Sequence, residues 1–161
     1  MATLTTSGRA GLAASIAARN IFLGLGAGDP DWDSEGTPPE SISSSALAAP
    51  VGFRKAAQVS FVAPAVEGAI ALPSGRYDIS ATQTNYLYLR FTLDFENAST
   101  ATIRETGILL DTVVDGELPS GQMFFAASEV DDPGTLYLLE HVPAIIRTPA
   151  TRETFEFVLT F

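Results

Sequence analysis

The sequence predicts an α+β fold, with one N-terminal helix and a mostly antiparallel β-sandwich or rolled sheet of about eight short strands. Residues 86–95 alternate strictly between apolar and polar side chains, which is typical of a strand with one buried face. Other short apolar runs are separated by turns rich in glycine and proline. An alanine-rich segment near the N-terminus follows hydroxyl residues that suit a helix N-cap.

Length and composition limit the classes of function. A chain of 161 residues fits a single domain over residues 1–161. The net charge of −10 disfavours nucleic acid and anionic membrane surfaces as partners. The apolar stretch Ala10–Gly28 is interrupted by Arg19 and Asn20, so it falls short of the ~20 residues of a membrane span. Without cysteine, and with His141 as the one histidine, thiolate chemistry and multi-histidine metal sites within one chain are excluded.

The first element is a helix expected over about residues 7–19. The hydroxyl side chains of Thr5–Ser7 offer its N-cap. Leu12 and Ile16 lie four residues apart and form a narrow apolar stripe beside alanines. We expect this stripe to pack on the protein's own sheet. The alternative is contact with a second copy, which makes Leu12 and Ile16 candidate self-association residues.

Residues 21–25 predict a short strand that ends in a loop with Gly24, Gly26 and Gly28. The glycine spacing is similar to that of a phosphate-binding loop. However, no predicted helix follows to present its N-terminus to a phosphate, and no lysine is near. We therefore interpret this segment as a connection without a phosphate site.

A long acidic loop is expected over about residues 29–45. It contains five carboxylates and three prolines but no lysine or arginine. Asp29, Asp31, Asp33 and Glu35 alternate as calcium ligands do, but the glycine comes later than the sixth position of a calcium loop. The favoured interpretation is a solvated loop without metal, and these four residues remain weak metal candidates.

Trp32, the one tryptophan, lies within this loop. It either packs on the domain's own surface or anchors a partner, because tryptophan is favoured in interface hot spots. We take Trp32 and the acidic loop as candidate partner contacts.

Further strands follow this loop. In residues 51–61 apolar side chains recur at odd-numbered positions, except that Lys55 interrupts the series. This pattern predicts an edge strand or a bulge. Residues 86–95 and 102–111 are joined by a short polar segment, which predicts a hairpin. The remaining short strands are expected over residues 68–73, 76–80, 122–126, 136–142 and 154–161.

Arg104 and Glu105 form the most specific polar pair of the sequence. Successive strand residues face opposite sides, so one should satisfy a neighbouring strand or loop and the other is free for a partner. A structural role is favoured for both. Between Arg104 and Arg147 there are eight acidic residues and no lysine or arginine, which predicts a negative surface suited to a basic partner. No serine, histidine or carboxylate constellation has catalytic identity and spacing, so we expect neither an enzyme nor a cofactor.

Several segments resemble the N-terminal region of phage tail-collar fibre proteins. TTSGRAGLAASIA (residues 5–17) and IFLGLGAGDP (residues 21–30) are similar to that family's helix start, alanine-rich helix and strand closing on a Gly-Asp turn. IRETGILLD (residues 103–111), the turn at residues 115–118 and the strand MFFA resemble its Arg-Glu-x-Gly strand, turn and return strand. The resemblance covers both ends of the region in order and leaves residues 36–85 unmatched.

The resemblance implies a structural virion protein of a tailed phage or prophage, a tail or baseplate component that attaches tail fibres. It would be made in the host bacterial cytoplasm and act in the virion tail. Arg104, Glu105 and Gly107 would be structural landmarks. Other tail or baseplate proteins would be its partners, and a homo-oligomer is expected because virion proteins act as rings or trimers. Fibre proteins continue into long shafts, whereas this sequence ends on a strand at Phe161, which implies an adaptor or baseplate subunit.

Two other classes remain open from the residues. One is a calcium- or carbohydrate-binding β-module, which exposed aromatic side chains at Tyr86 and Tyr88 beside acidic residues would allow. The other is a head–tail joining or capsid-decoration protein, which would have the same composition.

Overall fold

The computed structural model describes residues 1–161 and contains twelve strands, two α-helices and one 3-10 turn. The chain forms two compact units. The first unit contains residues 1–19, 56–91 and 154–161, and the second contains residues 20–55 and 92–153. Behaviour as a single domain stays a prediction. Neither α-helix has the length and hydrophobicity of a membrane-spanning segment.

The first unit begins with α1 (Thr6–Ala17), two residues shorter at its C-terminal end than expected. Of the three hydroxyl residues predicted to offer the N-cap, Thr5 is the one that does so, and its side chain accepts a hydrogen bond from the Gly8 N–H at 3.1 Å. Ala13 is fully buried, Ile16 is half-buried and Leu12 is exposed. The buried side of α1 is therefore centred on Ala13 and not on Leu12.

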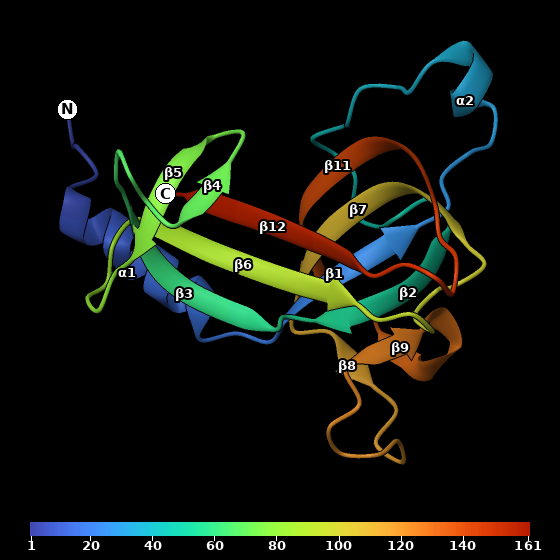
Figure 1. Ribbon diagram of the computed structural model, residues 1–161. Coiled ribbons are helices and arrows are strands. Elements are labelled where there is room, and N and C mark those ends of the chain that lie inside the picture. The colour runs from blue at the N-terminus through green and yellow to red at the C-terminus, as the bar shows by residue number, and fades with distance from the viewer. The chain divides into compact units, whose positions relative to one another are not determined.

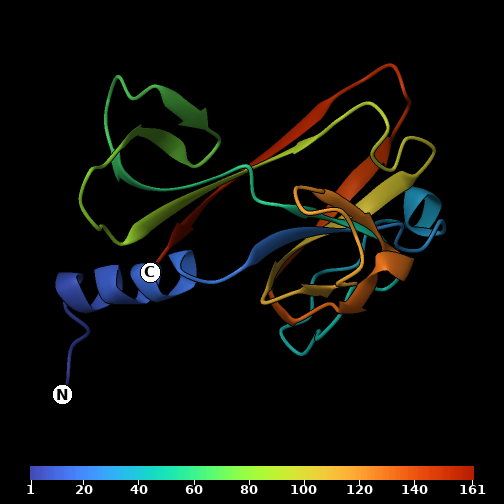
Figure 2. The same cartoon turned by 90° about the horizontal axis from the view of Figure 1, so that it is seen from below.

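The first unit also carries most of a five-stranded sheet of strand order β12-β6-β3-β5-β4. The hairpin of β5 and β4 is drawn in green in Figure 2. The strands with defined register run antiparallel. The bounds are β3 (Gln58–Pro64), β4 (Ile70–Leu72), β5 (Gly75–Ile79), β6 (Tyr86–Leu93) and β12 (Glu153–Thr160).

Both faces of β6 contain buried residues. Leu87, Leu89 and Phe91 are buried on one face, as the alternation predicts. On the other face Tyr88 is only 3% exposed and packs with Val62 and Tyr77, and Tyr86 is half-buried. The expectation that Tyr86 and Tyr88 are exposed aromatics is therefore wrong, because this face also has a small core. The Tyr88 hydroxyl donates a short hydrogen bond to Glu156.

The second unit contains a five-stranded antiparallel sheet of strand order β11-β7-β1-β2-β9. In Figure 1 β11 and β7 curve together, and β11 is an edge strand. A separate two-stranded sheet joins β10 and β8. The bounds are β1 (Ile21–Gly26), β2 (Pro50–Lys55), β7 (Thr102–Leu110), β8 (Val113–Val114), β9 (Phe124–Ala126), β10 (Val130–Asp132) and β11 (Thr135–Ile146), with the 3-10 turn η1 (Ala127–Glu129) between β9 and β10.

Two predictions of strand pairing are wrong. β6 and β7 do not form a hairpin, because β6 pairs with β3 and β12 whereas β7 pairs with β1 and β11. Residues 51–61 do not form one bulged strand. The chain leaves β2 after Lys55 and enters β3 at Gln58, so the break in parity marks a change of sheet.

The predicted α+β class with antiparallel sheets is confirmed. The structure has more strands than the roughly eight expected. The additional strands include β8 and β10, which have two and three residues. Such strands are too short for an alternating pattern to be visible in the sequence.

Candidate functional site

The candidate site is the connection between β1 and β2, residues 27–49, which we call the β1–β2 loop. It contains the predicted acidic segment and a single helical turn, α2 (Trp32–Glu35). Figure 1 shows the loop leaving β1, carrying α2 and returning to β2. Contacts with β1, β7 and β11 hold the loop at three places, described in turn below.

The first attachment is an ion pair between Arg104 of β7 and Asp33 of α2. The Arg104 Nε–H donates to Oδ1 of Asp33 at 2.9 Å and Nη2 donates to Oδ2 at 2.7 Å, so the pair is bidentate. Nη1 also donates to the Ala27 carbonyl at 3.0 Å. These hydrogen bonds and the arginine charge lower the pKa of Asp33, and the same contact raises the pKa of Arg104. Asp33 is thus held in its charged form.

The second attachment joins the loop to His141 of β11. The Trp32 and His141 rings lie 4.7 Å apart between centroids, at an angle of 40°. The His141 backbone N–H donates to Oε1 of Glu40 at 2.9 Å, and Nδ1 lies 2.8 Å from the Pro38 carbonyl oxygen. The first of these bonds lowers the pKa of Glu40. His141 therefore contacts both halves of the loop.

The third attachment is the side chain of Leu47, which lies over two glycines paired across β1 and β7, Gly24 and Gly107. A methyl group added at Gly24 would lie 2.8 Å from Cδ1 of Leu47, and one added at Gly107 would lie 3.1 Å from its Cδ2. The nearest atoms would be Cδ1 of Leu109, 2.5 Å from the group at Gly24, and Cδ1 of Leu136, 2.7 Å from the group at Gly107, so Leu47 is one of the side chains packed over these two glycines. The glycine spacing that is similar to a phosphate loop therefore has a packing role here.

Glu105 completes the third attachment at the end of the loop. Its side chain is 1% exposed, and its Oε1 accepts from the backbone N–H groups of Ala48 and Ala49 at 2.7 and 3.2 Å. The carboxylate lies against Gly26, where an added methyl group would be 2.1 Å from Oε1. Glu105 thus has the predicted structural role of satisfying a loop. Its neighbour Arg104 also binds the loop, so both residues of this pair make structural contacts with it.

The weak metal candidates do not converge. No group of three or more histidine, aspartate or glutamate side chains in residues 1–161 lies close enough to hold a metal ion. Asp29 accepts from the Asp31 backbone N–H at 3.0 Å, and Asp33 binds Arg104. Asp29, Asp31 and Glu35 are exposed. The arrangement therefore presents separate carboxylates to solvent on a loop that the sheet holds in place.

The structure brings together only some of the candidate contacts. Trp32, Arg104 and Glu105 all belong to the attachments of the β1–β2 loop. Leu12 and Ile16 lie on α1 in the first unit. The packing of Trp32 on His141 matches the first of its two interpretations, contact with the protein's own surface.

Sequence reasoning missed Glu40 and Leu47, which no local pattern identifies as loop attachments. It also missed Arg147, which is 2% exposed. Arg147 donates to the Asp94 carbonyl at 2.9 Å and to the Thr151 carbonyl at 3.1 Å, and it pairs with Glu153 at 3.6 Å. The one available signal for Arg147 is its position as the first basic residue after a long acidic stretch.

Comparison with known proteins identifies the family. The family model described as baseplate wedge 3 tail fiber network component matches residues 1–161, the whole of this chain. No curated protein matches the chain. The match agrees with the resemblance of the sequence to phage tail proteins, and it makes the chain a component of the phage tail and baseplate. The chain therefore belongs to the family of baseplate wedge 3 tail fiber network components.

Proposed function

We propose that this protein is a structural adaptor, without enzymatic activity, that attaches tail fibres to the phage baseplate through its β1–β2 loop. The observation that carries the proposal is the threefold attachment of this loop by Arg104, His141 and the Leu47–Glu105 region. A loop fixed in this way loses less conformational entropy when it binds a partner.

The charge of the loop supports a protein partner with basic groups. The loop carries five carboxylates and no lysine or arginine. Asp33 and Glu40 bind the sheet, whereas Asp29, Asp31 and Glu35 are exposed and face solvent. Electrostatic complementarity of this kind increases the association rate and selects against acidic partners.

The experiment that tests the adaptor role is a phage whose gene for this chain is deleted. We expect particles whose tails lack fibres in negative-stain electron micrographs, with fibres restored by the gene supplied in trans. Tails that carry a normal set of fibres without this protein would refute the adaptor role and leave the family membership intact.

A substitution tests the contribution of the loop. Trp32→Ala removes the ring that packs on His141 and should release α2, so fewer fibres are expected on particles complemented with this variant. Val66→Ala is a matched control, because it shortens an exposed apolar side chain in the first unit. Both variants should keep the circular dichroism spectrum of the parent. Normal fibre attachment by Trp32→Ala would exclude the loop as the attachment point.

We also propose that the protein works as a homo-oligomer through α1. Leu12 is exposed on α1, beside a helix surface of small residues, and Leu4 just before the helix is exposed too. Light scattering should give a mass of several chains for the parent and a lower mass for Leu12→Asp. Ser15→Asp places the same charge at another exposed position of α1 and should leave the mass unchanged. A parent that is monomeric at high concentration would refute this part of the proposal.

A further inference from the structure

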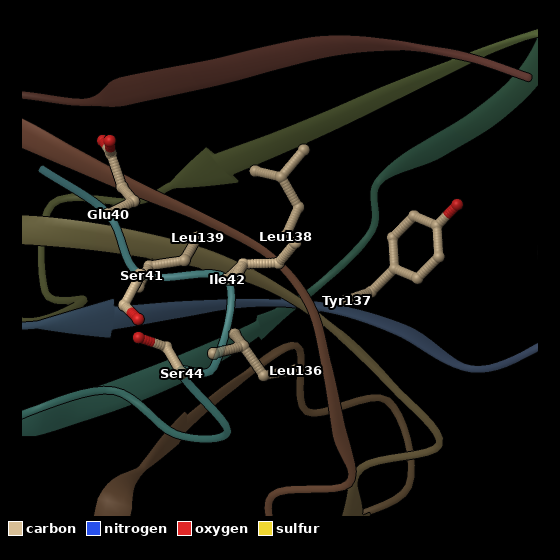
Figure 3. A pocket seen from close by; sticks show the side chains of 8 residues that line it. All are labelled: Glu40, Ser41, Ile42, Ser44, Leu136, Tyr137, Leu138 and Leu139. Carbon is tan, nitrogen blue, oxygen red and sulfur yellow. The ribbon is translucent and has the colours of Figure 1, made fainter.

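A groove runs between the β1–β2 loop and the edge of the second unit's sheet. Glu40, Ser41, Ile42 and Ser44 line one side, and residues 136–139 of β11 line the other. Figure 3 shows these side chains around the groove, which has a volume of about 390 Å³. Ile42 is fully exposed and Tyr137 is 42% exposed, so large apolar side chains face solvent at its border.

The backbone of β11 on this side has no strand partner, because β11 is the last strand of its sheet. The His141 N–H donates to Glu40, so it points away from β7. The pairing of β11 with β7 is regular from Leu138 to His141. Since alternate residues of an antiparallel strand point their N–H groups the same way, the Leu139 N–H also faces this open edge. At this edge the His141 N–H is thus bound by Glu40, whereas the Leu139 N–H faces the groove.

The charge around the groove is negative. The β1–β2 loop and the segment between Arg104 and Arg147 together form both of its sides. Neither segment contains a lysine or arginine, whereas each contains at least five acidic residues. A second copy of this chain would bring the same negative edge, because the net charge is −10. Charge complementarity therefore favours a basic segment of another protein.

We propose that this groove is a strand-addition site that takes an extended segment of another tail protein, with lysine or arginine residues alternating with β-branched apolar ones. The segment pairs with the β11 edge at Leu139, and its apolar side chains contact Ile42 and Tyr137. Its basic side chains lie near Glu40 and Glu140. The inference rests on the adaptor function proposed above and specifies the chemistry of the partner.

The test uses the whole protein, labelled with ¹⁵N, and a blocked peptide that alternates valine and lysine. We expect amide shift changes concentrated in residues 136–139 and 41–44, and slower hydrogen exchange of the Leu139 amide in the complex. The same peptide with glutamate in place of lysine should not bind. Shift changes spread over acidic residues outside the groove, or a Leu139 amide whose exchange is unchanged, would overturn the proposal.

Two matched variants separate groove binding from general attraction to an acidic protein. Ile42→Lys places a positive charge in the groove and should weaken binding of the lysine peptide about tenfold. Val66→Lys places the same charge at an exposed apolar position of the first unit and should change affinity by less than about twofold. Equal weakening by both variants would overturn the proposal. If Ile42→Lys halves the solution mass of the protein, the groove is a dimer interface. That result would overturn the proposal in favour of a second copy of the chain as the occupant.

The experiments distinguish a failure of the strand-addition site from a failure of the adaptor role. If deletion of the gene removes the fibres but the peptide does not bind the groove, only the strand-addition site is refuted. If the deletion phage keeps its fibres, the adaptor role fails whatever the peptide does.

Discussion

Replacing Gly26 by alanine should displace the Glu105 side chain from the end of the β1–β2 loop. The three atoms nearest to the added methyl group would all belong to Glu105, at 2.1 to 2.5 Å. The backbone of Gly26 lies in β1 and has no positive φ, so alanine is compatible with it. The strain therefore falls on one side chain, and the Ala48 and Ala49 N–H groups lose their acceptor.

The cost follows from these two hydrogen bonds. A hydrogen bond to a charged group contributes about 1.5–3 kcal/mol, and the bond of 3.2 Å belongs at the lower end of that range. Replacing glycine by alanine also stabilises the folded protein by about 0.4–1 kcal/mol, because it reduces the conformational entropy of the unfolded chain. We expect Gly26→Ala to lower the free energy of unfolding by about 2–4 kcal/mol. Glu105→Ala should cost a similar amount, because it removes the same acceptor.

The double variant distinguishes this mechanism from general damage to β1. Once Glu105 is alanine, the methyl group at position 26 enters vacated space and causes no further loss. The double variant should therefore be about as stable as Glu105→Ala alone, so the coupling energy equals the cost of Gly26→Ala, about 2–4 kcal/mol. The assay is guanidinium unfolding followed by circular dichroism for the sheet and by fluorescence of Trp32 for the loop. Two single costs that simply add in the double variant would refute the proposed contact.

Three further predictions concern the polar contacts. Arg104→Ala removes the partner of Asp33, so hydrogen exchange of the α2 amides should become faster while that of the β7 amides does not; equal acceleration in β7 would show damage to the sheet instead. Because the pKa values of Asp33 and Glu40 are lowered in the folded protein, their contribution to loop attachment is present above the ordinary carboxyl range. It should be lost as the pH falls through the lowered values, and tryptophan fluorescence should follow this loss; a signal insensitive to acid would contradict it. Burial and the bond to Glu156 raise the pKa of Tyr88 from about 10 to about 12, so its contribution to stability is present below pH 10 and should disappear between about pH 10 and 12. Tyr88→Phe should remove the highest step of the ultraviolet tyrosinate titration and lower the stability by about 1 kcal/mol, and an unchanged titration would contradict the assignment.

The sequence predicted local structure better than pairing. The N-cap at Thr5 and the buried face of β6 follow from residue type and from period two, and both are confirmed. The predicted hairpin of β6 and β7 is wrong, because alternation identifies the buried face of a strand but does not indicate which strand pairs with it. Phe95 continues the apolar parity but lies beyond the end of β6, where it is 45% exposed beneath Arg152.

The candidate site was predicted in part. The acidic segment, Trp32 and the pair Arg104 and Glu105 were singled out, and all of them meet at the β1–β2 loop. Their mutual contacts were not predictable, because the Glu105 carboxylate and the backbone N–H groups that donate to it are 56 and 57 residues apart in sequence, and no periodic pattern links them. The role of Leu47 depends on the register of two strands, Gly24 opposite Gly107, which the sequence does not specify.

The attachments of the β1–β2 loop limit how far it can extend. Six residues separate Glu40, held at β11, from Leu47, held over β1 and β7. At about 3.3–3.6 Å per residue, this interval cannot project beyond roughly half its contour length from the sheet. Because the attachments are made by side chains outside the β-ladder, added residues between them would lengthen the loop without altering any strand pair. The length of this interval therefore sets how far the loop reaches from the sheet, and the strand scaffold does not depend on it.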